Sequence, residues 1–165
     1  MSEEITREGG CACGAARYRV AGEPIYVNNC HCTQCQRQTG STSVVNAFFE
    51  TDRVTLLSGD LSDRPVKAGS GGDHVIVRCT GCGTALWSHY PRLGRLGLGL
   101  RVGTLDDSGA FRPNAAIFVA ERMPWVTLPE GIPAFEKYYD PQDLLPAASL
   151  ARSAALQERR KAGEG

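Results

Sequence analysis

Three cysteines at positions 30, 32 and 35 form the part of this sequence best suited to chemistry. The segment 29–35 reads NCHCTQC, so three sulfurs lie within six residues. Zn²⁺ binds thiolate sulfur at about 2.3 Å and prefers four ligands in a tetrahedron, so three cysteines leave one position unfilled. Alternate side chains of an extended chain share a face, which places Cys30 and Cys32 together, and a tight turn then brings Cys35 beside them. The spacing predicts a metal site with one position open to a substrate.

A fourth protein ligand would close this site and make it structural. His74 and His89 are the candidates for such a ligand. His31 is nearest in sequence, but on an extended chain its side chain points away from the flanking cysteines, so we expect it to hydrogen-bond locally. Each of the other two histidines is more commonly a packed or surface side chain than a ligand, which favours the open arrangement.

Four more cysteines occur as two close pairs and predict a closed metal site. Cys11 and Cys13 stand in the segment GGCACG, and Cys79 and Cys82 stand in CTGCGT, where glycines let the backbone turn towards a metal. Two such pairs are typical of zinc ribbons. Zinc binding contributes about 10 to 16 kcal/mol in zinc-finger peptides, against a net stability of about 5 to 15 kcal/mol for a domain. We therefore expect chelation to unfold the protein.

Composition narrows the class of protein. The 165 residues predict one main domain. The seven cysteines divide into the two sites without remainder, whereas internal disulfides cannot use up an odd number. The first residues lack a basic end followed by an apolar run, so we expect a reducing, cytoplasmic location. Basic and acidic residues balance at 18 each, which argues against a nucleic-acid partner, and no apolar stretch is long enough for a membrane span.

Short apolar runs, separated at regular intervals by Gly, Asp and Pro, are typical of an all-β protein. We expect strands at 16–20, 24–29, 43–50, 54–57, 66–67, 74–78, 95–105 and 115–120. They would form a zinc-binding β domain over residues 1–140. Residues 141–165 would be a tail that is either helical, from Ser149 to Lys161, or disordered. The predicted fold class is mainly β with little helix.

Several arginines and aromatic residues are candidates for contacts with a substrate. Arg37 follows the 30–35 cluster and could neutralise its charge, bind a substrate carboxylate or simply be solvated. Four aromatic residues could line a pocket, although aromatics on strands more often pack in the core: Trp87, Tyr90, Phe118 and Trp125. Four arginines could form a basic face, and we expect them to point outward from strands: Arg17, Arg19, Arg78 and Arg101.

Taken together, the motifs resemble the glutathione-dependent formaldehyde-activating enzyme family, whose relatives include vertebrate centromere protein V. The resemblance covers about residues 8–135. It is carried by GCACG at 10–14, CHCTQC at 30–35, CTGCGT at 79–84, GTLD at 103–106 and PW at 124–125. It implies a zinc-bound β-tent fold of short antiparallel sheets, a structural zinc on Cys11, Cys13, Cys79 and Cys82, and an exchangeable zinc on Cys30, Cys32 and Cys35. This chain has Gln36 where relatives often have Arg, and Ala115 and Ala116 where many have His.

The resemblance also implies an activity. It is that of a carbon-sulfur lyase acting on a small thiol adduct, such as glutathione plus formaldehyde giving S-hydroxymethylglutathione, with Cys30, Cys32 and Cys35 at the catalytic site. The partners would be a small thiol and an aldehyde. Two other functions stay open: a lyase or hydrolase acting on another thiol adduct, and a non-catalytic, zinc-stapled module that binds a protein partner or acts as a chaperone.

Overall fold

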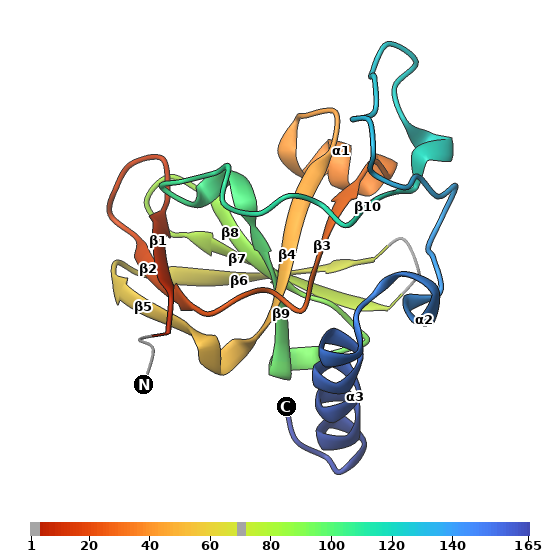
Figure 1. Ribbon diagram of the computed structural model, residues 1–165. Coiled ribbons are helices and arrows are strands. Elements are labelled where there is room, and N and C mark those ends of the chain that lie inside the picture. The colour runs from red at the N-terminus through yellow and green to blue at the C-terminus, as the bar shows by residue number, and fades with distance from the viewer. Residues whose placement is uncertain (1–3, 69–71) are drawn as a thin grey trace.

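Two β-sheets form the framework of the computed structural model, which describes residues 4–68 and 72–165 (Figure 1). The smaller sheet has three strands in the order β1-β2-β5, and adjacent strands within it are antiparallel. Its strands are β1 (Thr6–Gly10), β2 (Arg17–Ala21) and β5 (Val54–Ser58).

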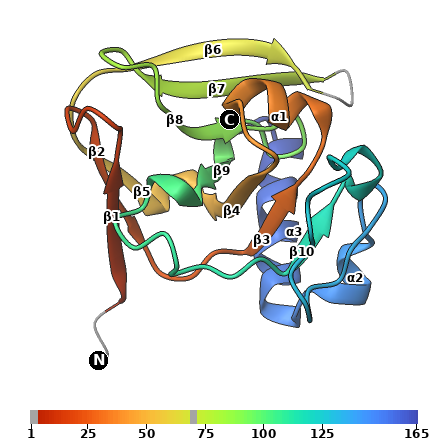
Figure 2. The same ribbon diagram turned by 90° about the horizontal axis from the view of Figure 1, so that it is seen from above.

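The larger sheet has seven strands in the order β10-β3-β4-β9-β8-β7-β6. They are β3 (Tyr26–Cys30), β4 (Val44–Glu50), β6 (Leu61–Lys67), β7 (Asp73–Cys79), β8 (Ala85–His89), β9 (Gly97–Arg101) and β10 (Ala115–Ile117). The sheet curls, so that β6, β7 and β8 lie on one side of the molecule and β3 and β10 on another (Figure 2). The prediction of a mainly β fold is confirmed.

One pair of strands departs from the expected antiparallel arrangement. β10 pairs with β3 in parallel, with Ala115 opposite Asn28 and Ile117 opposite Cys30. The long connection after β9 returns the chain to the far edge of the sheet, where it runs in the same direction as β3. β10 is also shorter than predicted, because Phe118 takes up a left-handed backbone conformation with φ of 54° and ends the strand.

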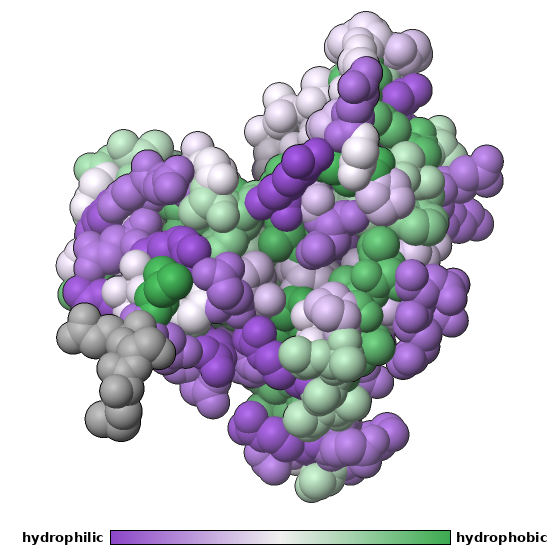
Figure 3. All heavy atoms as spheres, in the orientation of Figure 1, coloured by the Kyte–Doolittle hydropathy of each residue, from purple (hydrophilic) through white to green (hydrophobic). Residues whose placement is uncertain are grey.

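The main core lies between the two sheets. On β2, Tyr18 and Val20 are fully buried while Arg19 is exposed, as expected for alternating side chains on a strand. They pack with Phe49 of β4 and Leu100 of β9 in one apolar cluster. In the space-filling view, a notch at the top separates the part of the surface over β1 and β2 from the part that carries α1 (Figure 3).

Helices are few and mostly short. They are α1 (Thr33–Thr39), α2 (Pro141–Leu144) and α3 (Ala147–Lys161), with single turns at Thr51–Arg53, Gly94–Leu96, Val102–Thr104 and Val119–Glu121. Within the described ranges 4–68 and 72–165, none of the helices has the length and apolar character needed to cross a membrane.

The C-terminal tail is helical and packs on the β-sheet. α3 begins two residues before the predicted start, with Pro146 at its N-cap position. Leu156, only 2% exposed, packs with Ile25 and Leu93. Arg152 donates two hydrogen bonds to the Glu50 carboxylate, at 2.8 and 2.6 Å. The tail therefore belongs to the folded structure and can contribute side chains to a site.

Candidate metal centres and the adjoining cavity

The first cluster consists of Cys11, Cys13, Cys79 and Cys82, whose sulfurs all lie within 4.8 Å of one another. The first pair follows β1 and the second pair lies at the end of β7 and in the turn after it, so the cluster joins the small sheet to the large one. The Cys11 and Cys13 sulfurs are 3.4 Å apart, and those of Cys13 and Cys79 are 4.0 Å apart. Two sulfurs bound to one tetrahedral Zn²⁺ would be about 3.8 Å apart. The four cysteines therefore fit a closed zinc site.

Hydrogen-bond donors lie beside two sulfurs of this four-cysteine cluster. The Ala16 amide donates to the Cys11 sulfur at 3.2 Å and lowers the pKa of that thiol. The Thr84 hydroxyl lies 3.1 Å from the Cys82 sulfur and lowers the pKa of Cys82 to about 5. Donors of this kind stabilise thiolates, which are the form that binds a metal.

The second cluster, Cys30, Cys32 and Cys35, forms where β3 leads into α1. Cys30 is the last residue of β3, Cys32 is the N-cap of α1, and Cys35 lies in the first turn of the helix. The Cys32 sulfur accepts a hydrogen bond from the Cys35 amide at 3.3 Å, as an N-cap side chain does. The predicted tight turn after Cys32 is thus the first turn of a helix. The three sulfurs lie within 4.8 Å of one another.

In the described part of the chain, no histidine or carboxylate joins the three sulfurs within that distance. His89 is buried and its Nδ1 lies 3.0 Å from the Gly97 carbonyl oxygen. His74 stacks on Tyr90, with ring centroids 4.4 Å apart. His31 is 1% exposed, and burial lowers its pKa. The three-cysteine cluster therefore keeps an unfilled position with respect to the described residues.

A cavity of about 770 Å³ borders the three-cysteine cluster, and all three cysteines line it. The cavity lies within the curl of the large sheet, and its walls include residues from β3, β4, β7 and the tail before α3. Ligand pockets in proteins span about 300 to 1,000 Å³, so this one could hold a small organic molecule beside the sulfurs.

Arg101 is a functional candidate that the sequence analysis placed wrongly. It was expected to point outward, but it is only 5% exposed. Its guanidinium donates to Ser88 Oγ at 2.9 Å and to the Asn46 side-chain oxygen, and more weakly to Tyr90 and Gln38, all of which are neutral. A buried cation needs a counter-charge. Gln38 lies one turn after Cys35 on α1, and the charge of Arg101 acts to lower the pKa of Cys35, so the guanidinium lies near the three-cysteine cluster. As thiolates, these sulfurs would supply the counter-charge.

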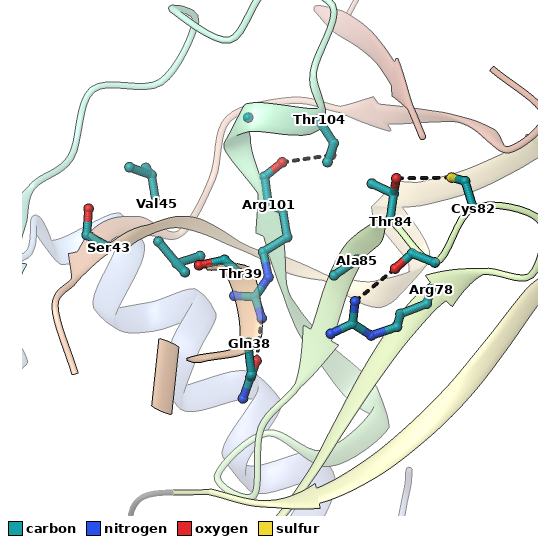
Figure 4. A pocket seen from close by; sticks show the side chains of 13 residues that line it. Gln38, Thr39, Ser43, Val45, Arg78, Cys82, Thr84, Ala85, Arg101 and Thr104 are labelled. Carbon is teal, nitrogen blue, oxygen red and sulfur yellow. Dashed lines mark hydrogen bonds between the residues drawn. The ribbon is translucent and has the colours of Figure 1, made fainter. Parts of the chain in front are cut away.

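Arg101 also borders a second cavity, of about 430 Å³, that reaches the four-cysteine cluster at Cys82. In Figure 4 its side chain extends from β9 towards Gln38, and Arg78 and Thr84 lie on the other side of this cavity. Arg101 is thus located between the two cysteine clusters.

Burial, and then the charge of Arg101, lower the pKa of His74 to about 4.

The other predicted contact residues fall into two groups. Arg37, Tyr90 and Phe118 line the 770 Å³ cavity, and Arg37 is exposed. Trp87 instead packs edge-on against Tyr18 in the core, and Trp125 is 75% exposed. Sequence reasoning also missed Tyr26, Phe48, Tyr138 and Tyr139 as lining residues. The presence of aromatic residues in the sequence does not by itself predict that these four side chains line the same cavity.

One of three comparisons with known proteins identifies a family for this chain. No curated protein matches the chain. A solved structure of a Rhodobacter sphaeroides protein, a structural-genomics target, has 21% sequence identity and a TM-score of 0.46; the match covers 61% of this chain and 88% of that one. A family model described as "Glutathione-dependent formaldehyde-activating enzyme" matches residues 6–121, which include both cysteine clusters. The chain belongs to the glutathione-dependent formaldehyde-activating enzyme family.

Proposed function

We propose that this protein is a zinc-dependent carbon-sulfur lyase that makes and breaks the bond between a small thiol and an aldehyde carbon in the cytoplasm. With glutathione and formaldehyde the product would be S-hydroxymethylglutathione. The observation that carries the proposal is the three-cysteine cluster, which has no fourth ligand among the described residues and borders a cavity of about 770 Å³.

The donor sets fit two zinc ions with different roles. Cys11, Cys13, Cys79 and Cys82 would hold a structural ion, because four sulfurs complete its tetrahedron. Cys30, Cys32 and Cys35 would hold an exchangeable ion. That ion would supply a fourth coordination position at which a thiol is held as its thiolate, whereas a free thiol of pKa near 8.5 is only about 3% ionised at pH 7.

Arg101 would balance the charge of the active site. Three thiolates exceed the charge of one Zn²⁺, and the buried guanidinium beside them offsets the excess. The aldehyde carbon would be held next to the sulfur in the cavity, since positioning of two reactants gives large effective concentrations.

His74, which is neutral at pH 7 because its pKa is lowered to about 4, would act as a hydrogen-bond acceptor or weak base for the hydroxyl proton in the direction that breaks the C–S bond. When sulfur attacks the carbonyl carbon, the π electrons of the C=O bond move to oxygen, which then takes a proton. In the reverse direction the hydroxyl loses that proton as the C–S bond breaks. The His74 Nε2 atom is buried, has no hydrogen-bond partner among the described residues, and belongs to a ring that lines the cavity.

Exchange spectroscopy tests the proposal. NMR would measure exchange among formaldehyde, glutathione and their adduct with the native zinc protein and with Cys32→Ser. We expect acceleration by the native protein and the uncatalysed rate with the variant. The variant should retain one zinc per chain, which serves as an internal control for folding. Equal rates with both proteins would remove the claim for this substrate pair, and two tightly held ions with no activity would favour the non-catalytic binding module.

A further inference from the structure

The cavity beside Cys30, Cys32 and Cys35 has one wall made of stacked rings. Tyr26 and Phe48 are stacked with centroids 4.4 Å apart, Phe48 and Tyr90 are 5.5 Å apart, and Tyr90 stacks on His74 at 4.4 Å. All four residues line the cavity. Gly99 makes this wall possible, because a Cβ atom at that position would lie 2.9 Å from the Tyr90 ring. The rings therefore form a continuous aromatic surface that leads towards the cluster.

The C-terminal third of the chain supplies a second aromatic wall. Phe118 and Tyr138 meet edge to face, with centroids 4.7 Å apart, and Tyr139 lies next to them in the lining. Tyr138 is 69% exposed although it borders the cavity, so it lies at the mouth. The Tyr139 hydroxyl donates to the Asn28 side-chain oxygen at 2.9 Å, which fixes this part of the tail against β3.

Phe118 takes its place in this wall with a strained backbone. Among the described residues it is the one non-glycine residue with a positive φ, at 54°. Such a conformation is unfavourable for a residue with a Cβ atom, and it persists where the surrounding structure imposes it, often at binding sites. The strain turns the chain directly after β10, beside Cys30, which pairs with Ile117.

The charged side chains that line the cavity, those of Arg37, Arg92 and Glu121, belong to exposed residues. The Glu121 carboxylate accepts hydrogen bonds from the Thr33 amide and hydroxyl. A thiol substrate such as glutathione, which carries carboxylates, could place them near Arg37 and Arg92. The space between the aromatic walls suits an uncharged, flat group, because aromatic rings gain most from offset-stacked and edge-to-face contacts with other rings. Formaldehyde is a single carbon and would leave these walls without contacts.

We propose, building on the carbon-sulfur lyase function, that the preferred aldehyde is aromatic, and that its ring occupies the space between the two aromatic walls. The substrate sulfur then forms a bond to the aryl aldehyde carbon, the π electrons of the C=O bond move to oxygen, and the oxygen takes up one proton. The product is an aryl hemithioacetal, and the reverse reaction releases the thiol and the aldehyde. No oxidant or reductant is required.

The test compares two aldehydes with one thiol on the zinc-loaded, full-length protein. NMR exchange rates would be measured for glutathione with 4-nitrobenzaldehyde and with formaldehyde, each relative to its uncatalysed rate. We expect the acceleration to be at least about tenfold greater for the aromatic aldehyde, in keeping with the energy of ring contacts. Equal acceleration, or greater acceleration of formaldehyde, would overturn the inference.

Two variants and a binding measurement make the test specific. Tyr138→Ala should lose about tenfold more acceleration with the aromatic aldehyde than with formaldehyde. Trp125→Ala removes an aromatic side chain that is even more exposed and lies outside the cavity lining, so it should change neither rate. If the Trp125 variant lowers the aromatic rate as much as the Tyr138 variant does, the assignment of the wall is wrong.

Binding of benzyl alcohol, which cannot form the adduct, separates failure of this inference from failure of the proposed function. Saturation transfer from the protein to benzyl alcohol, lost in Tyr138→Ala, would support an aromatic site even if neither aldehyde reacts. In that case the proposed lyase function would be wrong, and the proposal that the cavity binds an aromatic ring would be supported. Absence of transfer together with active formaldehyde exchange would leave the lyase function intact and overturn the aromatic preference.

Discussion

The two cysteine clusters differ in how deeply their sulfurs lie and in what surrounds them. In the four-cysteine cluster, Cys13 and Cys82 are exposed. In the three-cysteine cluster, two residues are buried and Cys32 is half-buried, yet all three line a large cavity. The more exposed cluster has a full set of ligands, and the more buried one has an unfilled position. Under the proposed function, access to chemistry depends on an open coordination position beside a cavity, and exposure of sulfur is a poor guide to it.

The clusters also differ in what they connect. The first joins the turn after β1 to the end of β7 and the turn after it, and Cys79 follows Cys13 by 66 positions. The second lies within one local segment, from the end of β3 to the first turn of α1. Loss of the long-range link should therefore affect folding, and loss of the local one should affect function.

The largest expected effect comes from breaking the long-range link. Cys79→Ser should unfold the protein, because zinc binding at four cysteines contributes about 10 to 16 kcal/mol in zinc-finger peptides and a domain has only about 5 to 15 kcal/mol of net stability. Circular dichroism and thermal unfolding would measure this, with Cys32→Ser as the matched control. A cooperatively folded Cys79→Ser protein would show that the first cluster does not hold the two sheets together.

Removal of metal should reveal two populations of zinc. A colorimetric chelator should take the ion of the three-cysteine cluster first, with loss of activity and little change in circular dichroism. The second ion should leave slowly, together with unfolding. In Cys32→Ser the fast phase should be missing. A single phase that removes both ions while the protein stays folded would contradict the division into an exchangeable and a structural site.

The grouping of the seven cysteines into two clusters could be predicted from the sequence. Short cysteine spacings are a local signal, because a metal needs its ligands close together and a turn or strand end brings neighbours together regardless of the rest of the fold. Short strands with turn residues between them predicted the mainly β class for the same reason. The helix over Ser149 to Lys161 was also anticipated, as one of two alternatives for the tail.

The parts that sequence could not supply depend on tertiary packing. Arg101 ends β9, whose residues are buried throughout, so the alternation of faces that suggested an outward side chain does not apply to this central strand. The parallel pairing of β10 and the aromatic wall formed by Tyr138 and Tyr139 likewise arise from segments far apart in sequence. No local sequence pattern predicts these contacts between distant segments.

Arg101 is a single side chain whose loss should affect the two clusters differently. Arg101→Met should weaken zinc binding at the three-cysteine cluster by about 10- to 100-fold, the range typical for residues that support metal ligands, because its buried charge is lost. The four-cysteine site should be unaffected. Competition with a chelator of known affinity would measure both. Arg101→Lys is the matched control, because it keeps the charge but not the forked hydrogen bonds to Ser88 and Asn46. Its zinc affinity at the three-cysteine cluster should lie between that of the native protein and that of Arg101→Met.

If Arg101→Met leaves the affinity of the three-cysteine site unchanged, or lowers that of both sites equally, the guanidinium does not act as its counter-charge. A loss of overall stability must be separated from this effect, since removal of the guanidinium leaves buried polar partners unpaired. Thermal unfolding of the zinc-loaded variant supplies that measurement.

Thr84 offers the corresponding change at the closed site, with the smallest expected effect. Its hydroxyl lies 3.1 Å from the Cys82 sulfur, and its oxygen accepts a hydrogen bond from the Ala12 amide at 3.2 Å. Thr84→Val keeps the shape of the side chain but removes both contacts, which should cost about 1 kcal/mol and speed zinc release from this site by about fivefold. Thr84→Ser keeps the hydroxyl and is the control. Because Thr84 does not line the cavity beside Cys30, Cys32 and Cys35, the exchange of glutathione adducts should continue at the native rate. A drop in that rate without a change in folding would mean that the two clusters communicate, for example through Arg101, which borders the smaller cavity together with Thr84 and Cys82.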